Sequence, residues 1–188
     1  MKVLGIMGSP RIKGNTDLLL DEALAGIASR GADVEKIVVD RLKISPCREY
    51  YGCLKDGNCV IRDDMDSIYP KLLDTDIMIV ASPTFFYGLP AQLKALIDRC
   101  QAIWARKYVL KQELPNTGRK GALIGVAATR GKQLFDGSIL TVKYFFQTIG
   151  VDYVDELLIR GIDKKGEIKE HPTALSDAHQ LGIRLAQG

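Results

Sequence analysis

Residues 8–16 have the composition of a phosphate-binding loop. They read Gly-Ser-Pro-Arg-Ile-Lys-Gly-Asn-Thr and join an apolar, strand-like stretch to a helix-like one. Backbone N–H groups at a helix N-terminus attract anions, and hydroxyl and guanidinium groups add further hydrogen bonds. The alternative is that Asn15 or Thr16 merely caps the helix. Because the loop is longer than a cap requires, we favour a phosphate site made by Ser9, Arg11, Gly14, Asn15 and Thr16.

The spacing of this loop excludes two widespread phosphate-binding motifs. Gly14 is followed by Asn15 and Thr16, where a Walker A loop has Lys and Ser or Thr. Gly5 and Gly8 do not have the G-x-G-x-x-G spacing of a dinucleotide-binding turn. The loop therefore indicates a phosphate site of another class.

A second candidate segment, residues 82–90, contains three consecutive aromatic residues between Pro83 and Gly88. Such a loop suits a flat apolar ligand, whose edge could accept hydrogen bonds from backbone amides. The rings could instead pack at a subunit interface or cover the core. The ligand-contacting candidates are Pro83, Thr84, Phe85, Phe86 and Gly88.

A third segment, residues 127–132, is small and cationic. Its Thr129 and Arg130 could approach the same ligand, or the segment could be an ordinary turn. A phosphate loop beside an aromatic, amide-rich wall describes a pocket for flavin mononucleotide (FMN) better than a sugar-phosphate site. We name no catalytic acid or base, because the flavin itself carries hydride chemistry.

The elements that position these segments alternate between strands and helices. An alternation of this kind predicts parallel strands covered by helices on both faces, with ligands beyond the carboxyl ends of the strands. We expect an α/β, flavodoxin-like three-layer sandwich with sheet order 2-1-3-4-5, formed by residues 1–188 as a single domain with an insertion at 40–64. The expected strands are residues 2–7, 34–39, 76–81, 120–127 and 151–159, and the expected helices are 16–30, 66–73, one from Pro90 through Trp104, 133–149 and 172–187.

Four segments, taken in order, resemble the NADPH-dependent FMN reductase family over nearly the whole chain. They are residues 8–16, residues 59–65 (Cys-Val-Ile-Arg-Asp-Asp-Met), residues 82–86 (Ser-Pro-Thr-Phe-Phe) and residues 93–99 (Leu-Lys-Ala-Leu-Ile-Asp-Arg). The resemblance implies a flavodoxin-like fold, noncovalent FMN, reduction by NAD(P)H, and a homodimer or homotetramer. It also implies that the candidates in the first loop hold the phosphate, and that those in the aromatic loop border the isoalloxazine ring.

The iron–sulfur flavoproteins of that family carry four cysteines spaced C-x2-C-x2-C with a fourth a few residues on. Here Cys47, Cys53 and Cys59 occupy three of these positions, and Tyr50 occupies the other. A cubane cluster ordinarily has four thiolate ligands. An iron–sulfur cluster with a non-cysteine ligand, a three-iron cluster or a zinc site is possible, but we favour an ordered insertion with reduced thiols and no metal site. Cys100 is expected in the core.

The acidic pair Asp63-Asp64 and the two histidines are not expected to take part in catalysis or metal binding. Asp63 and Asp64 are expected to cap the following helix, with Arg62 nearby. His171 and His179 lie far from the cysteines along the chain and are expected at the surface or at a helix cap.

Composition restricts the location and the partners. The formal net charge is +3 and no Lys/Arg-rich run occurs, which argues against nucleic acid. No apolar run approaches the roughly 18 residues of a membrane span, which argues against a membrane. Reduced cysteines are typical of the cytoplasm, where we expect the protein.

Three functions remain open. We favour an FMN-dependent oxidoreductase that takes hydride from NAD(P)H and passes electrons to a small acceptor such as a flavin or quinone. The second is an electron carrier, either an iron–sulfur flavoprotein or a flavodoxin-like shuttle, with a protein donor. The third is a non-catalytic module that binds a phosphate ligand. Trp104 and Tyr108 are expected to face the pocket of a neighbouring subunit.

Overall fold

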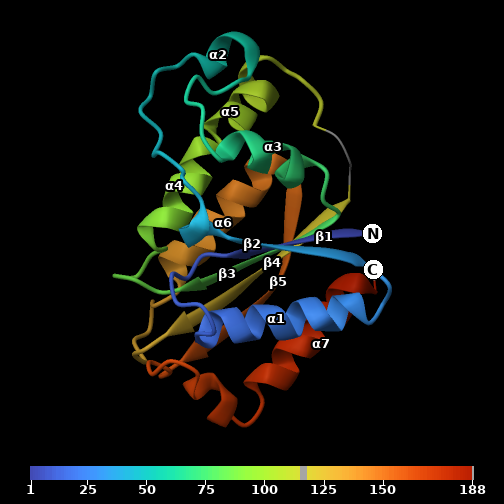
Figure 1. Cartoon of the computed structure of the whole chain (residues 1–188), viewed down its shortest axis with the longest axis vertical. Helices are drawn as coiled ribbons and strands as arrows, with labels where there is room; N and C mark the ends of the chain where they lie inside the picture. Colours follow the sequence, from blue (N-terminus) through green and yellow to red (C-terminus); the bar gives the residue numbers. More distant parts are fainter. Residues whose placement is uncertain (115–117, 188) are drawn as a thin grey trace.

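The computed structural model describes residues 1–114 and 118–187, and its centre is a sheet of five parallel strands (Figure 1). Hydrogen bonding places the strands in the order β2-β1-β3-β4-β5, which confirms the expected flavodoxin-like topology. The expected strand bounds were correct to within one or two residues. The strands are β1 (Lys2–Met7), β2 (Asp33–Val38), β3 (Ile77–Pro83), β4 (Arg119–Ala127) and β5 (Val151–Arg160).

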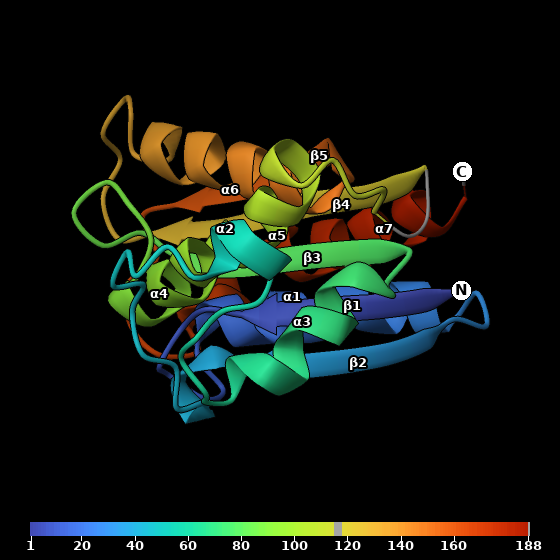
Figure 2. The ribbon, with the colours of Figure 1, turned by 90° about the horizontal axis from the view of Figure 1, so that it is seen from above.

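Helices cover both faces of the sheet. Helices α1 (Asn15–Ala28) and α7 (Ala174–Ala186) lie on one face, and the remaining long helices lie on the other (Figures 1 and 2). The opposite layer consists of α3 (Met65–Leu73), α4 (Ala91–Arg99), α5 (Gln101–Trp104) and α6 (Asp136–Ile149), with the short α2 (Cys53–Asp56) above it. Single turns of 3-10 helix form at Val39–Arg41 and Glu167–Glu170.

The alternation of side chains along each strand divides the core in two. Leu4 and Ile6 of β1 pack toward α3–α6, whereas Val3 and Met7 pack toward α1 and α7. Burial on both faces explains why these strands are nearly continuous apolar runs. Among the described residues, no helix is both long and apolar enough to cross a membrane.

The helix expected from Pro90 through Trp104 is not continuous. It ends at Arg99, restarts as α5, and passes into a π-helical turn over Ala105–Val109. Cys100 is buried as expected. Trp104 is 37% exposed and lies against Tyr108, with ring centroids 5.6 Å apart.

The 40–64 insertion is an ordered part of the structure. It contains α2, which ends where Gly57 adopts a left-handed conformation with φ of 79°. A side chain at Gly57 would lie 2.4 Å from Cγ of Arg106, so this turn requires glycine. Arg106 fastens the turn by donating through Nε to the Gly57 carbonyl at 2.8 Å.

Candidate functional site

The loops after β1, β3 and β4 meet at the carboxyl edge of the sheet, and there they enclose a cavity of about 90 Å³. Most of the predicted ligand-binding residues line this cavity: Ser9, Arg11, Gly14, Asn15, Thr16, Pro83, Thr84 and Phe85. The other predicted residues, Phe86, Gly88, Thr129 and Arg130, do not line it. The structure adds Val126, Ala128, Ile162, Asp163 and Lys165.

Backbone hydrogen bonds hold the first loop close to β3. The Gly8 N–H donates to the Ala81 carbonyl at 2.8 Å, and the Gly14 N–H closes a turn on the Arg11 carbonyl at 3.0 Å. A Cβ at Gly8 would lie 2.5 Å from Cδ2 of Leu93, so glycine permits the loop to approach α4. The buried Ser9 hydroxyl oxygen accepts a hydrogen bond from the Arg11 N–H at 3.1 Å. The loop is therefore pre-formed.

Helix α1 begins at this cavity without a side-chain cap. Gly14 is the N-cap residue, and Asn15 and Thr16 are the first two helical residues, both buried. Neither Asn15 nor Thr16 is therefore the N-cap residue of this helix. The first N–H groups of an uncapped helix lack intrahelical partners and carry the positive end of the helix dipole. This end of α1 can accept an anion from the cavity.

The Asn15 side chain is hydrogen-bonded to the segment after β5. Its amide nitrogen donates to the Lys164 carbonyl at 2.9 Å, and its amide oxygen accepts from the Ile168 N–H at 3.2 Å. Arg11 also reaches this segment, donating to the Asp163 carbonyl at 3.3 Å. The residues after β5 thus form a wall of the cavity. The ligand-binding residues expected from the sequence lie after the first, third and fourth strands, and this segment was not among them, although it follows a strand that ends at the same edge.

The aromatic loop is a two-residue turn. Phe85 and Gly88 exchange backbone hydrogen bonds of 2.9 and 3.0 Å, and Phe86 and Tyr87 between them have φ of 48° and 63°. Left-handed backbone is unfavourable for such side chains, and strain of this kind concentrates at functional sites. The Phe86 ring is fully exposed. Because the Thr84 N–H also bonds the Val126 carbonyl, the amides free to meet a ligand edge belong to the turn itself.

Thr129 and Arg130 contact the segment after β5 rather than the cavity. The Gly161 N–H donates to the Ala127 carbonyl at 2.8 Å and to the Thr129 carbonyl at 3.2 Å. A Cβ at Gly161 would lie 2.7 Å from Nη2 of Arg130, so the guanidinium packs directly against this glycine. These two residues hold the segment after β5 in place.

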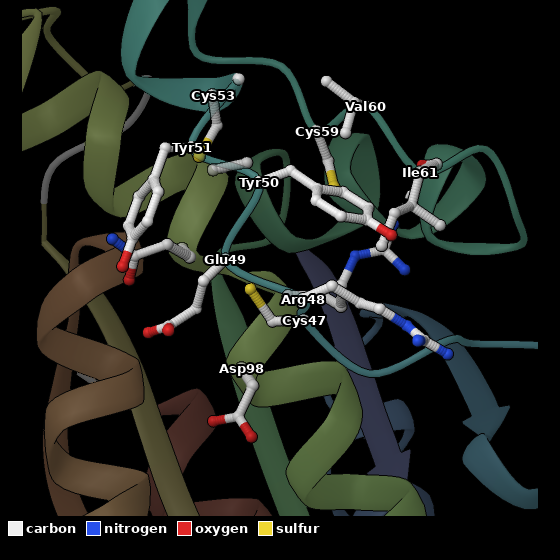
Figure 3. Close-up of a pocket in the computed structure, with 14 residues that line it drawn as sticks. Cys47, Arg48, Glu49, Tyr50, Tyr51, Cys53, Cys59, Val60, Ile61 and Asp98 are labelled. Carbon is white, nitrogen blue, oxygen red and sulfur yellow. Dashed lines mark hydrogen bonds between the residues drawn. The ribbon is translucent and has the colours of Figure 1, made fainter.

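A larger cavity, of about 340 Å³, lies in the 40–64 insertion over α4 and α5. Cys47, Cys53 and Cys59 all line it, together with Tyr50. In Figure 3 the sulfurs of Cys53 and Cys59 point toward Cys47, whose sulfur points back toward them. Burial raises the pKa of the Cys53 thiol, and the nearby Cys59 and Cys47 raise it further. The backbone is left-handed on both sides of Tyr50, at Glu49 (φ 52°) and Tyr51 (φ 56°).

Arg99 forms the floor of this second cavity, and its side chain is 0% exposed. Its Nη1 donates to Asp63 at 2.6 Å and to the Ser45 carbonyl at 2.9 Å, and its Nη2 donates to the Ile61 carbonyl at 3.1 Å. Its Nε is buried and has no partner among the described residues. Sequence reasoning missed Arg99, although an arginine inside an apolar helical repeat is a signal that it has a buried partner.

Asp63 therefore does more than cap α3. It does accept the Met65 N–H at 3.0 Å, but its other oxygen binds Arg99. Burial alone would raise the pKa of this carboxyl; the Arg99 guanidinium and the N–H groups of Ser45 and Met65 outweigh burial and lower it. Asp64 accepts from the Lys43 N–H at 2.7 Å, and Arg62 pairs with Asp66 instead.

A family model for NADPH-dependent FMN reductases matches residues 1–136, which include the phosphate loop, the cysteine insertion and the aromatic loop. The chain belongs to the NADPH-dependent FMN reductase family. It is accordingly an oxidoreductase of the FMN-dependent, NAD(P)H-using kind. The segment after β5, which completes the first cavity, lies outside the matched residues.

This member of the FMN reductase family is similar in sequence to two named relatives and in fold to a solved structure. An iron-sulfur flavoprotein of Methanocaldococcus jannaschii is 45% identical over 100% of this chain and 96% of its own length. A Bacillus subtilis protein named as an NAD(P)H-dependent FMN-containing oxidoreductase is 28% identical over 96% of each chain. A solved NAD(P)H:quinone oxidoreductase from Methanothermobacter marburgensis shares the fold, with a TM-score of 0.72, 16% identity and 98% of each chain covered.

Proposed function

We propose that this FMN reductase family member binds FMN in the cavity at the carboxyl edge of the sheet, takes hydride from NAD(P)H and passes electrons to a small acceptor such as a flavin or quinone. The observation that carries the proposal is the uncapped start of α1, which lines the cavity beside the buried hydroxyl residues Ser9 and Thr16. Such a helix terminus binds a phosphate monoester without further rearrangement. FMN supplies the redox chemistry when bound, and the chain supplies binding and orientation.

The roles of the residues follow from their positions. Ser9, Arg11, Gly14 and Thr16 hold the phosphate, because all four line the cavity around the start of α1. Asn15 contributes its backbone, since its side chain is bonded to the segment after β5. The isoalloxazine ring lies along Pro83, Thr84 and Phe85 and meets the turn at Phe86 and Gly88, with Thr129 and Arg130 bracing the opposite loop.

Binding of the phosphate is tested with Thr16→Val. Because the buried hydroxyl would hydrogen bond a charged phosphate, its loss should weaken FMN about tenfold. Thr148→Val, on the exposed part of α6, is the matched control and should leave FMN affinity unchanged. The measurement is quenching of FMN fluorescence on titration with apo-protein. Equal affinities for wild type and Thr16→Val would place the phosphate elsewhere.

We also propose that the chain is a single cytoplasmic domain that assembles as a homodimer or homotetramer. Trp104, Tyr144 and Leu140 are exposed apolar side chains on neighbouring elements, and Trp104 and Tyr144 line one groove between α5 and α6. Burying that face in a second copy would remove the exposed apolar surface from water. Sedimentation of the FMN-bound protein tests this: a monomer with full activity would contradict it.

A second candidate function is that of an iron–sulfur flavoprotein electron carrier. What favours it is that three cysteines line one cavity together with Arg99, whose Nε has no hydrogen-bond partner among the described residues. A buried donor of this kind should bond an acceptor, and a cluster sulfide is one. Cys47, Cys53 and Cys59 would bind three irons, whereas Tyr50 leaves the fourth without a thiolate. Among the described residues, no group of three or more His, Cys, Asp or Glu side chains is placed so that it could hold a metal ion.

The two functions are separated by anaerobic reconstitution with iron and sulfide. A carrier should retain stoichiometric iron and acid-labile sulfide, and Cys53→Ser should lose both. Cys100→Ala removes a core thiol outside the cavity and is the control. If wild type retains no more iron than Cys53→Ser, the cluster is absent. Tyr50→Cys should then create iron binding if the remaining geometry is that of a cluster site.

A further inference from the structure

The segment after β5, residues 161–168, closes one side of the cavity in which we place the FMN phosphate. Ile162, Asp163 and Lys165 line that cavity. The segment is held in shape by its own hydrogen bonds, because one oxygen of Glu167 accepts the N–H groups of Asp163 and Lys164, both at 2.8 Å. These bonds also lower the pKa of the Glu167 carboxyl, which stays charged and keeps the turn closed. The wall is thus pre-formed.

Asn15 attaches this wall to the phosphate loop. Its side chain donates to the Lys164 carbonyl and accepts from the Ile168 N–H, so both ends of the amide are used by one segment. The buried start of α1 and the segment after β5 are thereby held at a fixed separation. A side chain on the inner side of the segment must then face whatever occupies the cavity.

Three lining residues carry charge, and their balance is positive. Arg11 and Lys165 are cationic and Asp163 is anionic. Arg11 is engaged with the Asp163 carbonyl. Lys165 has no hydrogen bond or ion pair to any described residue. Its neighbour Lys164 carries the same charge but does not line the cavity. A lysine that lines an anion site and makes no other ion pair is available to pair with the anion.

We propose that Lys165 is a phosphate-selecting residue of the FMN site, and that Asn15 is the positioning residue that holds it there. This inference rests on the proposed function, since it assumes that FMN occupies the cavity. Lys165 pairs with the phosphate monoester and makes the site prefer FMN to riboflavin, which has the same ring system without the phosphate. The wall lies outside the part of the chain that the family model matches.

The experiment compares FMN and riboflavin binding to apo-protein by fluorescence quenching. Lys165→Ala should weaken FMN about tenfold and riboflavin less than twofold. Lys164→Ala removes the same charge from the adjacent position and should change neither. Equal effects of the two substitutions on FMN would overturn the role of Lys165 while leaving FMN binding intact. A wild-type protein that binds neither flavin would overturn this inference together with the proposed function.

The role of Asn15 has a separate readout that does not involve FMN. In the apo-protein, Asn15→Ala should accelerate hydrogen exchange at the Ile168 amide, and Lys165→Ala should not. Asn15→Ala should also reduce the preference for FMN over riboflavin. A loss of FMN affinity in Asn15→Ala without faster exchange at Ile168 would mean that Asn15 acts on the ligand directly, which would overturn the positioning role.

Discussion

The Arg99 guanidinium and the Asp63 carboxylate form a buried ion pair, 2.6 Å apart, that joins the end of α4 to the cysteine insertion. The same guanidinium donates to the carbonyls of Ser45 and Ile61, which lie just before Cys47 and just after Cys59 in the chain. The insertion is therefore not a free loop. Helix α4 has nine residues, so Arg99 at its end lies about 12 Å along the helix axis from Ala91 at its start.

Removing the Arg99 cation should destabilise the protein strongly. Arg99→Met leaves the largely buried Asp63 carboxylate without its cation, and breaking a buried pair in this way costs about 3 kcal/mol or more. Arg62→Met removes an exposed pair with Asp66 and should cost less than about 0.5 kcal/mol. Urea unfolding measures both. Equal losses for the two variants would contradict the anchoring role of Arg99.

Stability should depend on pH through Asp63. Its pKa is lowered in the folded protein, so the pair contributes fully above the unfolded carboxyl pKa of about 3.9. That contribution is lost as pH falls through the folded pKa. We expect Asp63→Asn to be less stable than wild type at pH 6 and the difference to shrink below about pH 4. A difference that stays constant down to pH 3 would contradict this assignment; Asp66→Asn is the exposed control.

Phe86 should be dispensable for folding and important for electron transfer. Its backbone has φ of 48° and its ring contacts solvent, so Phe86→Gly should leave stability unchanged or raise it by up to about 1 kcal/mol. Reduction of bound flavin by NADPH should slow about tenfold, because an exposed apolar ring beside the flavin is lost. Lys111→Gly is the control: it relieves the same left-handed backbone strain at a residue away from the site (φ 54°), and it should leave the rate of flavin reduction unchanged. Stopped-flow absorbance measures the rate of flavin reduction, and urea unfolding measures the stability. Equal reduction rates in the two variants would contradict the role of Phe86.

The Cys53 thiol should alkylate only at unusually high pH. Burial raises its pKa, as do the neighbouring Cys59 and Cys47 thiolates. The pH at which iodoacetamide reacts at half its maximal rate should therefore lie above that of the same cysteine in urea, near the ordinary value of about 8.5. Peptide mass spectrometry resolves Cys53 from the other thiols. A folded midpoint at or below the unfolded one would contradict the crowding of thiols in this cavity.

The fold and most of the first cavity were predictable from local patterns. Apolar runs separated by amphipathic helices indicate a parallel sheet, and a glycine- and hydroxyl-rich turn after β1 predicts an anion site. Both patterns lie within short stretches of chain. The cavity is accordingly lined by residues 83–85 and by five residues of the first loop and helix start, Ser9, Arg11, Gly14, Asn15 and Thr16. The local patterns do not fix the order of the strands, and the predicted order was that of the flavodoxin-like fold.

Features that depend on distant segments were not predictable. The Asn15 amide bonds residues about 150 positions away, and Arg99 pairs with Asp63 across 36 positions. Nothing in the local sequence distinguishes Lys165 from Lys164, and only the turn closed by Glu167 places one of them at the cavity. The break in the helix after Arg99 was missed because the spacing of apolar residues continues through Trp104, although the helix itself is interrupted between α4 and α5.

The most direct test of the account is an anaerobic titration of the FMN-loaded protein with NADPH, followed by the visible absorbance of the flavin. We expect one equivalent of FMN per chain and loss of the oxidised flavin absorbance with one equivalent of NADPH. Flavin that stays oxidised with NADPH and NADH but is reduced by dithionite would contradict the oxidoreductase assignment. It would leave a flavoprotein that receives electrons from a protein donor.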